Sequence, residues 1–223
     1  METPSDEASL PNDDPQVRKA HEYLAVCDEW DAILNRLGQI ISTHDDVWVA
    51  QSILRSSRRA YLHMSNGWRS DSTYVGWACR NLIELRFVAN YVVKSPENRR
   101  RFIDDGVIDS EESTAALAAL MDADEPGSAT KDQELSEIGN LDNLLRREAS
   151  FAGKKYLAPM RLDVDFSSNA LLAMHKLCSK LVHPTAQSIL ISECQHERDG
   201  LFLCGASCFI RLVDELVAFV KTL

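Results

Sequence analysis

The stretch that decides the fold class is STYVGWACRNLIELRFVANYVVKS, residues 72–95. Apolar side chains recur in it at helical spacing, for example from Trp77 to Leu85 and on to Val92. Pro96 ends this helix, because a proline pushes the residue before it out of helical geometry. Few polar side chains interrupt the segment, so we expect it to be the most buried helix of the chain.

Segments with the same period lie on both sides of this helix. We expect helices over residues 15–41, 44–67, 109–120, 133–149, 169–183 and 200–223. No long window alternates polar and apolar residues, which is the pattern of a half-buried strand. Short connections favour antiparallel packing of neighbouring helices, so the sequence predicts an all-α, multi-helix antiparallel bundle.

Composition and charge place the chain among globular proteins and limit its partners. Of its 223 residues, 45% are hydrophobic, which is enough for one substantial core. We expect a disordered acidic arm over residues 1–14 and a single helical-bundle domain over residues 15–223. The net charge of −10 disfavours a generic nucleic-acid coat. No apolar run of about 18 residues and no basic, apolar leader occurs, so we expect a cytoplasmic protein with no membrane partner.

Several cysteines and histidines are candidate metal ligands. The chain has six cysteines, which we expect to pack mainly as free thiols in helices rather than to form disulfides. Four possible zinc ligands are Cys194, His196, Cys204 and Cys208. Their spacing matches no standard zinc-binding pattern, and His175 turns about 80° away from His183 on one helix. We therefore expect no metal site and no cofactor.

Short basic islands occur in this acidic chain. Arg55, Arg58 and Arg59 form one island and residues 98–101 another. Such runs are most often solvated helix surface, but they can also face RNA or a nucleotide phosphate. The sequence has no Walker loop, dinucleotide fingerprint, serine-hydrolase elbow or metalloprotease helix, so these activities have no support.

A charged pair interrupts the central helix. Arg80 and Glu84 lie one helical turn apart, with Asn81 beside them. Burying a guanidinium and a carboxylate is costly unless the two bond to each other or to a ligand. Two interpretations are therefore open, a structural ion pair and the polar lining of a functional groove.

The run HKLCSKLVHP, residues 175–184, places a histidine and two lysines on one helix face. Seven helical steps amount to about 700°, so His183 lies close to Lys176, with Ser179 and Lys180 on either side. Histidine can transfer a proton near neutral pH, and lysines can stabilise the charge that develops on a cleaved phosphodiester. The alternative is a solvated face that ends in a histidine at the helix C-terminus.

The runs RNxxEL over residues 80–85 and KxxSKLVHP over residues 176–184 together resemble bacterial helical proteins related to the HEPN superfamily. The resemblance covers roughly residues 45–220. It implies a helical bundle, frequently dimeric, and many such proteins are ribonucleases with an arginine–histidine motif at the dimer interface. By this comparison His183 is the motif histidine, and Lys176 stands where arginine is expected. Lysine lacks the planar fork that clamps a phosphate through two bonds, so the sequence departs from the family pattern here.

Two functions from different classes follow from these patterns. The first is a HEPN-like, metal-independent endoribonuclease or RNA-processing toxin of a stress or defence system. Its expected residues are His183, Lys176 and Arg80 for catalysis and Lys180, Ser179, Glu84 and Asn81 for binding. The second is a non-catalytic dimeric helical module that binds a protein partner or a small ligand. The resemblance and the wide apolar stripe of the last helix favour a homodimer in both cases.

Overall fold

The computed structural model is helical in all its regular elements, as the sequence predicts. It describes residues 14–40, 44–68, 72–106, 109, 158–166, 169–182 and 195–223. Its helices are α1 (Pro15–Ile40), α2 (His44–Gly67), α3 (Ser72–Lys94), the 3-10 helix η2 (Pro159–Arg161), α6 (Asn169–Val182) and α8 (Gln195–Val220). Residues 96–106 are also helical, and no strand occurs within the described ranges.

Most helix limits agree with the predicted ones, and the main difference is the start of α8. α1 begins at Pro15, α2 ends at Gly67, and Pro96 starts a new helix after α3. α8 begins at Gln195 rather than near Gly200. A glycine inside a helix costs only about 1 kcal/mol relative to alanine, so Gly200 does not prevent the helix from starting before it.

Some sequence predictions fall outside the described residues. They are the acidic arm apart from Asp14, the helix expected over 109–120 apart from Asp109, the helix expected over 133–149, and His183. They remain predictions from the sequence.

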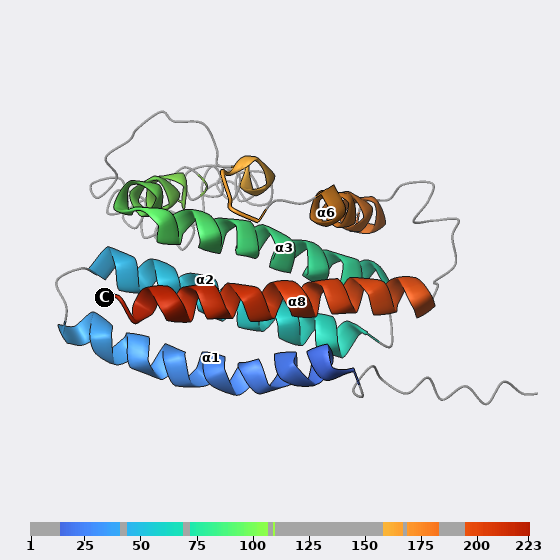
Figure 1. Cartoon of the computed structure of the whole chain (residues 1–223), viewed down its shortest axis with the longest axis horizontal. Coiled ribbons are helices and arrows are strands. Elements are labelled where there is room, and N and C mark those ends of the chain that lie inside the picture. The colour runs from blue at the N-terminus through green and yellow to red at the C-terminus, as the bar shows by residue number, and fades with distance from the viewer. Residues whose placement is uncertain are drawn as a thin grey trace, which may run out of the picture.

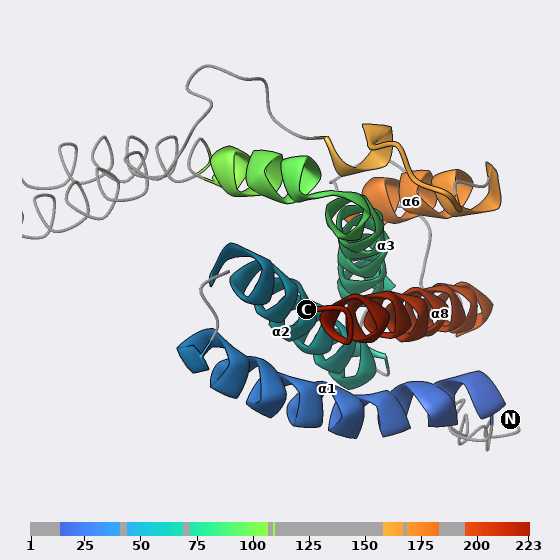
Figure 2. The same ribbon diagram turned by 60° about the vertical axis from the view of Figure 1, so that its left-hand side comes forward.

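Four long helices form one bundle, with α3 and α8 at its centre. α8 contacts α1, α2 and α3, while α3 contacts α2, α6 and α8, as Figure 1 shows from the side. In Figure 2, α1 lies below α2 and α8, and α6 and the helix over 96–106 lie above them on the side of α3. α3 has buried residues along its whole length, from Ser72 to Val92, which confirms its expected place in the core.

α8 runs parallel to α1 and α3. Near its start, Leu203 accepts a hydrogen bond from Gln16 of α1 (3.1 Å), and further along both helices Tyr23 donates one to Asp214 (2.6 Å). The consecutive pairs α1–α2 and α2–α3 are antiparallel, as expected (Figure 1). The prediction of a wholly antiparallel bundle is therefore wrong for α8, because the long stretch of chain after α3 returns to the end of the bundle where α3 begins.

The wide apolar stripe of α8 is buried within the chain. Phe209 is fully buried and stacks on Tyr61 of α2, with ring centroids 4.6 Å apart and planes 7° from parallel. At Gly205 the two helices approach so closely that an added Cβ would collide with the side chain of Met64. Because α1, α2 and α3 cover the stripe, its width does not require a second chain. Within the described ranges, no helix combines the length and the apolar character that crossing a bilayer requires.

Candidate functional site

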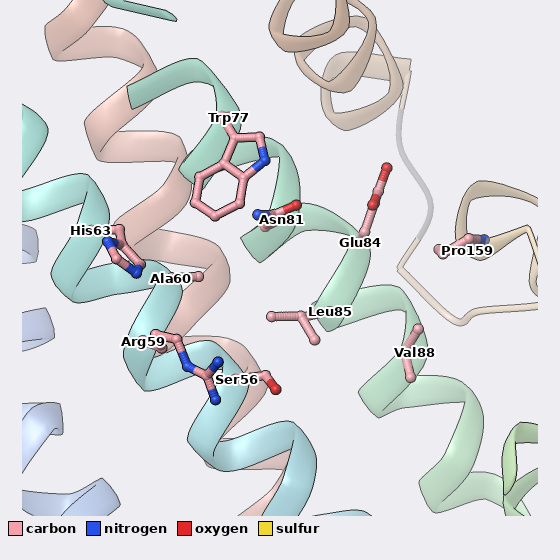
Figure 3. A pocket seen from close by; sticks show the side chains of 10 residues that line it. All are labelled: Ser56, Arg59, Ala60, His63, Trp77, Asn81, Glu84, Leu85, Val88 and Pro159. Atoms are coloured by element: carbon pink, nitrogen blue, oxygen red, sulfur yellow. The ribbon is translucent and has the colours of Figure 1, made fainter. Parts of the chain in front are cut away.

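A pocket of about 340 Å³ opens between α2 and α3 (Figure 3). It is lined by Ser56, Arg59, Ala60 and His63 of α2, by Trp77, Asn81, Glu84, Leu85 and Val88 of α3, and by Pro159 of η2. On each helix these positions recur at steps of three and four residues, which places their side chains on one face. The pocket is therefore built from one face of each of two adjacent helices.

Small side chains on α2 leave the space open. Ser56 and Ala60 lie one helical turn apart and face α3 across the pocket. Leu85 and Val88 supply apolar side chains from the α3 side. Neither small residue of α2 is long enough to fill the gap, so a hollow with partly apolar walls remains.

An aromatic group borders this pocket. Trp77 has 40% of its surface exposed and Tyr74 has 38%, and their rings lie 6.1 Å apart at 22°. His63 of α2 meets each ring at its edge with centroids 5.9 Å apart, and its Nδ1 lies 2.7 Å from the Tyr74 hydroxyl. Trp77 belongs to the helix that the sequence predicts to be the most buried. It is a surface residue instead, because its face of α3 borders the open pocket.

Arg59 differs from the other two arginines of α2 in its surroundings. Arg55 and Arg58 pair with Asp31 and Asp28 of α1, each with 2.7 Å between nitrogen and oxygen. Arg59 extends into the pocket (Figure 3), and none of the carboxylates in the described ranges pairs with it. Of the basic island predicted from the sequence, two members are thus structural and one faces a cavity.

Glu84 accepts hydrogen bonds from two other side chains, and the three residues together join α3 to α6. Arg80 Nε donates a hydrogen bond to Glu84 Oε1 (2.9 Å), and His175 Nε2 donates one to the same oxygen (2.7 Å). All three side chains are less than one-third exposed. The interpretation of Arg80 and Glu84 as an ion pair is confirmed. Glu84 and Asn81 also line the pocket, whereas Arg80 does not.

Of the remaining predicted site residues, Lys176, Ser179 and Lys180 lie on α6, and they do not line the pocket. Lys176 and Lys180 are exposed, and Ser179 is half-buried with its hydroxyl donating to the carbonyl of His175 (2.9 Å). His183 lies outside the described residues. The grouping of Lys176, Ser179 and Lys180 with Arg80 and Glu84 in one groove is therefore not observed.

Sequence reasoning missed His63, Trp77 and His175 as members of the site. The spacing of Trp77, Asn81 and Glu84 places them on one helix face, and this signal was present in the sequence. No sequence signal indicated that His63 faces them or that His175 meets Glu84. Both contacts depend on how separate helices pack.

The described residues hold few candidate metal ligands close together. They contain no group of three or more histidine, cysteine or acidic side chains that could hold a metal ion. Cys204 and Cys208 lie on α8, while Cys194 and the side chain of His196 are outside the described part. Comparison of the chain with protein-family models, curated proteins and solved structures finds no match.

Proposed function

We propose that this chain is a non-catalytic binding module whose α2–α3 pocket holds a small, planar, negatively charged ligand of the nucleotide class. The observation that carries this proposal is the position of Arg59. Its guanidinium extends into the pocket without a carboxylate partner in the described ranges, and the exposed ring of Trp77 lies in the same hollow. A cation and an aromatic ring that line the same pocket complement the phosphate and the base of a nucleotide.

The size of the pocket supports a small ligand. Its volume of about 340 Å³ lies at the lower end of the range of about 300–1,000 Å³ that is typical of ligand pockets. Such a space suits one ring system better than a folded segment of a partner protein. Ala60, Leu85 and Val88 offer apolar contacts to the faces and edges of such a ring.

Polar side chains in the pocket can fix the orientation of a ligand. Asn81 carries both a donor and an acceptor on its amide. If the Tyr74 hydroxyl donates to His63 Nδ1, the Nε2–H of the ring is the donor left for a ligand. The negative charge of Glu84 is partly offset, because Arg80 and His175 both bond to it. The attraction of an anionic group by Arg59 is therefore opposed only weakly by the carboxylate of Glu84.

Adenosine monophosphate is a suitable probe of this pocket. Trp77→Ala should weaken its binding about tenfold or more, because stacking of a base on an aromatic ring contributes about 1–3 kcal/mol. Arg59→Ala should weaken binding of adenosine monophosphate but leave binding of uncharged adenosine nearly unchanged. Ligand-observed NMR with the full chain measures both effects, with inorganic phosphate as a third ligand that tests the charge alone.

Matched variants make the result specific to the pocket. Trp48→Ala removes an exposed tryptophan that lies on α2 and does not line the pocket. Arg36→Ala removes an exposed arginine of α1. Both should bind adenosine monophosphate as the unmodified chain does. Equal binding by Trp77→Ala and the unmodified chain, or no binding by either, would count against the nucleotide assignment.

We also propose a second candidate function, the metal-independent endoribonuclease that the HEPN-like resemblance implies, acting on RNA as a cytoplasmic homodimer. The contact of Arg80, Glu84 and His175 favours it. A carboxylate, an imidazole and a guanidinium are the groups that a phosphodiester cleavage without metal needs as base, acid and anion holder. His183 and Lys176 remain the residues that the resemblance assigns to the motif.

A cleavage assay separates this second function from the first. RNA of mixed structure is incubated with the full chain in the presence of EDTA, beside His175→Ala, Glu84→Gln, His183→Ala and Lys176→Ala. A ribonuclease that uses these groups should lose a factor of about 10²–10⁴ in rate when its acid or base is removed. Cleavage that all variants retain equally would indicate a contaminating enzyme, and absence of cleavage would leave the binding module as the function.

A further inference from the structure

Residues 158–166 form a strap that lies across α3, on the side of α3 away from α1 (Figure 2). The strap begins with η2, and Leu162, which follows η2, has extended backbone geometry. Every second side chain packs against the core, namely those of Met160, Leu162, Val164 and Phe166. The side chains between them are exposed. This alternation is typical of an extended segment that lays one face on the protein, so the strap is a docked element rather than a free loop.

Two polar side chains of α3 hold the strap at the end away from η2. Lys94 Nζ donates a hydrogen bond to the carbonyl of Asp163 (3.0 Å) and pairs with Oδ1 of Asp165 (2.8 Å). Asn90 is only 9% exposed. Its Oδ1 accepts a hydrogen bond from the backbone N–H of Asp165 (3.2 Å), and its amide donates to Glu215 of α8 (3.4 Å). Because a buried amide oxygen needs a partner, Asn90 fixes where the strap docks.

Phe166 holds the same end of the strap through its ring. It meets the ring of Phe87 at its edge, with centroids 5.1 Å apart and planes at 72°. The guanidinium of Arg86 lies 3.8 Å from the Phe166 centroid. Phe166 is only partly buried, so these contacts lie at the surface of the bundle. Truncation of this ring should therefore loosen the strap without removing a side chain from the middle of the core.

The other end of the strap borders the α2–α3 pocket. Pro159 lines this pocket, and in Figure 3 it lies on the opposite side of Glu84 from the α2 residues. No residue of η2 is buried. The two backbone hydrogen bonds of η2, of 2.9 and 3.2 Å, join residues of the strap to one another. Within the described ranges, the hydrogen bonds between the strap and α3 thus involve residues 163–165, while the end beside the pocket rests on apolar contacts.

We propose that the strap is a movable wall of the α2–α3 pocket, and that Asn90, Lys94 and Phe166 are the positioning residues that hold this wall closed. Release of their contacts moves Pro159 away and opens the pocket along α3. A surface segment with few buried contacts opens at a lower free energy than the bundle that carries it, and a partly exposed ion pair such as that of Lys94 adds little. A ligand that contacts the docked wall favours the closed state, and this coupling rests on the nucleotide site proposed above.

Amide hydrogen exchange of the full chain, measured by mass spectrometry, tests whether the strap opens. Three backbone N–H groups of the strap are hydrogen-bonded while it is docked, those of Arg161, Leu162 and Asp165. Phe166→Ala should speed exchange in peptides from residues 158–166 about tenfold, because it removes the aromatic contacts. Lys94→Ala, a second variant in case the first does not fold, should speed it about two- to fivefold. Exchange in α8 should stay as in the unmodified chain.

A matched control and a reporter in the pocket make the result specific. Trp30→Ala truncates another partly buried ring, which lies on α1, and should leave exchange of the strap unchanged. Val88 lines the pocket and is 8% exposed, so Val88→Cys reports access to the pocket without any ligand. Alkylation by iodoacetamide at this position should be about tenfold faster when Phe166→Ala is added, and unchanged when Trp30→Ala is added. Unchanged strap exchange in Phe166→Ala, or faster exchange without faster alkylation at position 88, would overturn the proposal.

Adenosine monophosphate separates this inference from the proposed function. The nucleotide should slow exchange of the strap in the unmodified chain, and its affinity should fall in Phe166→Ala by the factor by which the docked fraction falls. Absence of binding to the unmodified chain would remove the nucleotide assignment, while exchange and alkylation would still decide whether the strap moves. Equal affinity in the unmodified chain and Phe166→Ala, despite faster exchange in the variant, would show that the strap does not act on the site.

Discussion

Phe209→Ala is expected to lower the free energy of unfolding by about 3–5 kcal/mol, because truncation of a buried phenylalanine leaves a cavity that its neighbours cannot fill. Phe209 has no exposed surface and stacks directly on Tyr61, which is equally buried. Its ring lies at the interface of α2 and α8, so the loss affects the contact that holds the last helix in the bundle. Urea denaturation followed by circular dichroism measures the change.

The comparison with Phe209→Leu shows whether the cavity is the cause. Leucine retains most of the volume, so its loss of stability should be clearly smaller than that of alanine. Trp48→Ala, at a position with 52% of its surface exposed, should change stability little. A loss of less than about 1 kcal/mol in Phe209→Ala would mean that α8 does not pack as described.

Arg99→Ala is expected to lower the free energy of unfolding by a similar amount, about 3–5 kcal/mol, because it leaves the carboxylate of its partner without a positive charge beside it. Arg99 is 6% exposed, pairs with Asp46 of α2, and donates a hydrogen bond to the carbonyl of Val92 (2.8 Å). Its guanidinium also lies over the ring of Phe219, 4.8 Å from the centroid. One side chain thus connects the helix over residues 96–106 to α2, α3 and α8.

An exposed ion pair of the same chemistry provides the control for Arg99. Arg55 pairs with Asp31, but their side chains are 50% and 29% exposed, and such pairs contribute about 0–1 kcal/mol. Arg55→Ala should therefore change the unfolding midpoint only slightly, while Arg99→Ala should shift it strongly. Equal losses in the two variants would show that burial of the Arg99 pair has no special effect.

Local patterns predicted most of the fold. Helical spacing identified α3 as a core helix, Pro15 marked a helix start and Pro96 a helix end, and the spacing of Arg80 and Glu84 indicated their ion pair. Each of these statements concerns residues within a few turns of one another. At that range the period of the helix and the chemistry of caps and prolines decide the geometry.

Contacts between distant segments could not be predicted in the same way. His175 reaches Glu84 because α6 lies on α3 at Gly76, where an added Cβ would stand only 3.3 Å from Leu181. Trp77 was expected among buried residues, since the sequence does not reveal which face of α3 borders a hollow. A single sequence shows which residues are available for these sites but not how helix packing brings them together.

The central place of α8 in the bundle has a consequence for the synthesis of this protein on the ribosome. α1, α2 and α3 are made first, yet the apolar faces that surround Tyr61 and Cys79 stay open to water until α8 has been translated. Such a surface on a nascent chain is prone to aggregation and attracts chaperones. Completion of the core therefore waits until α8 has emerged from the ribosome and can pack against the other three helices.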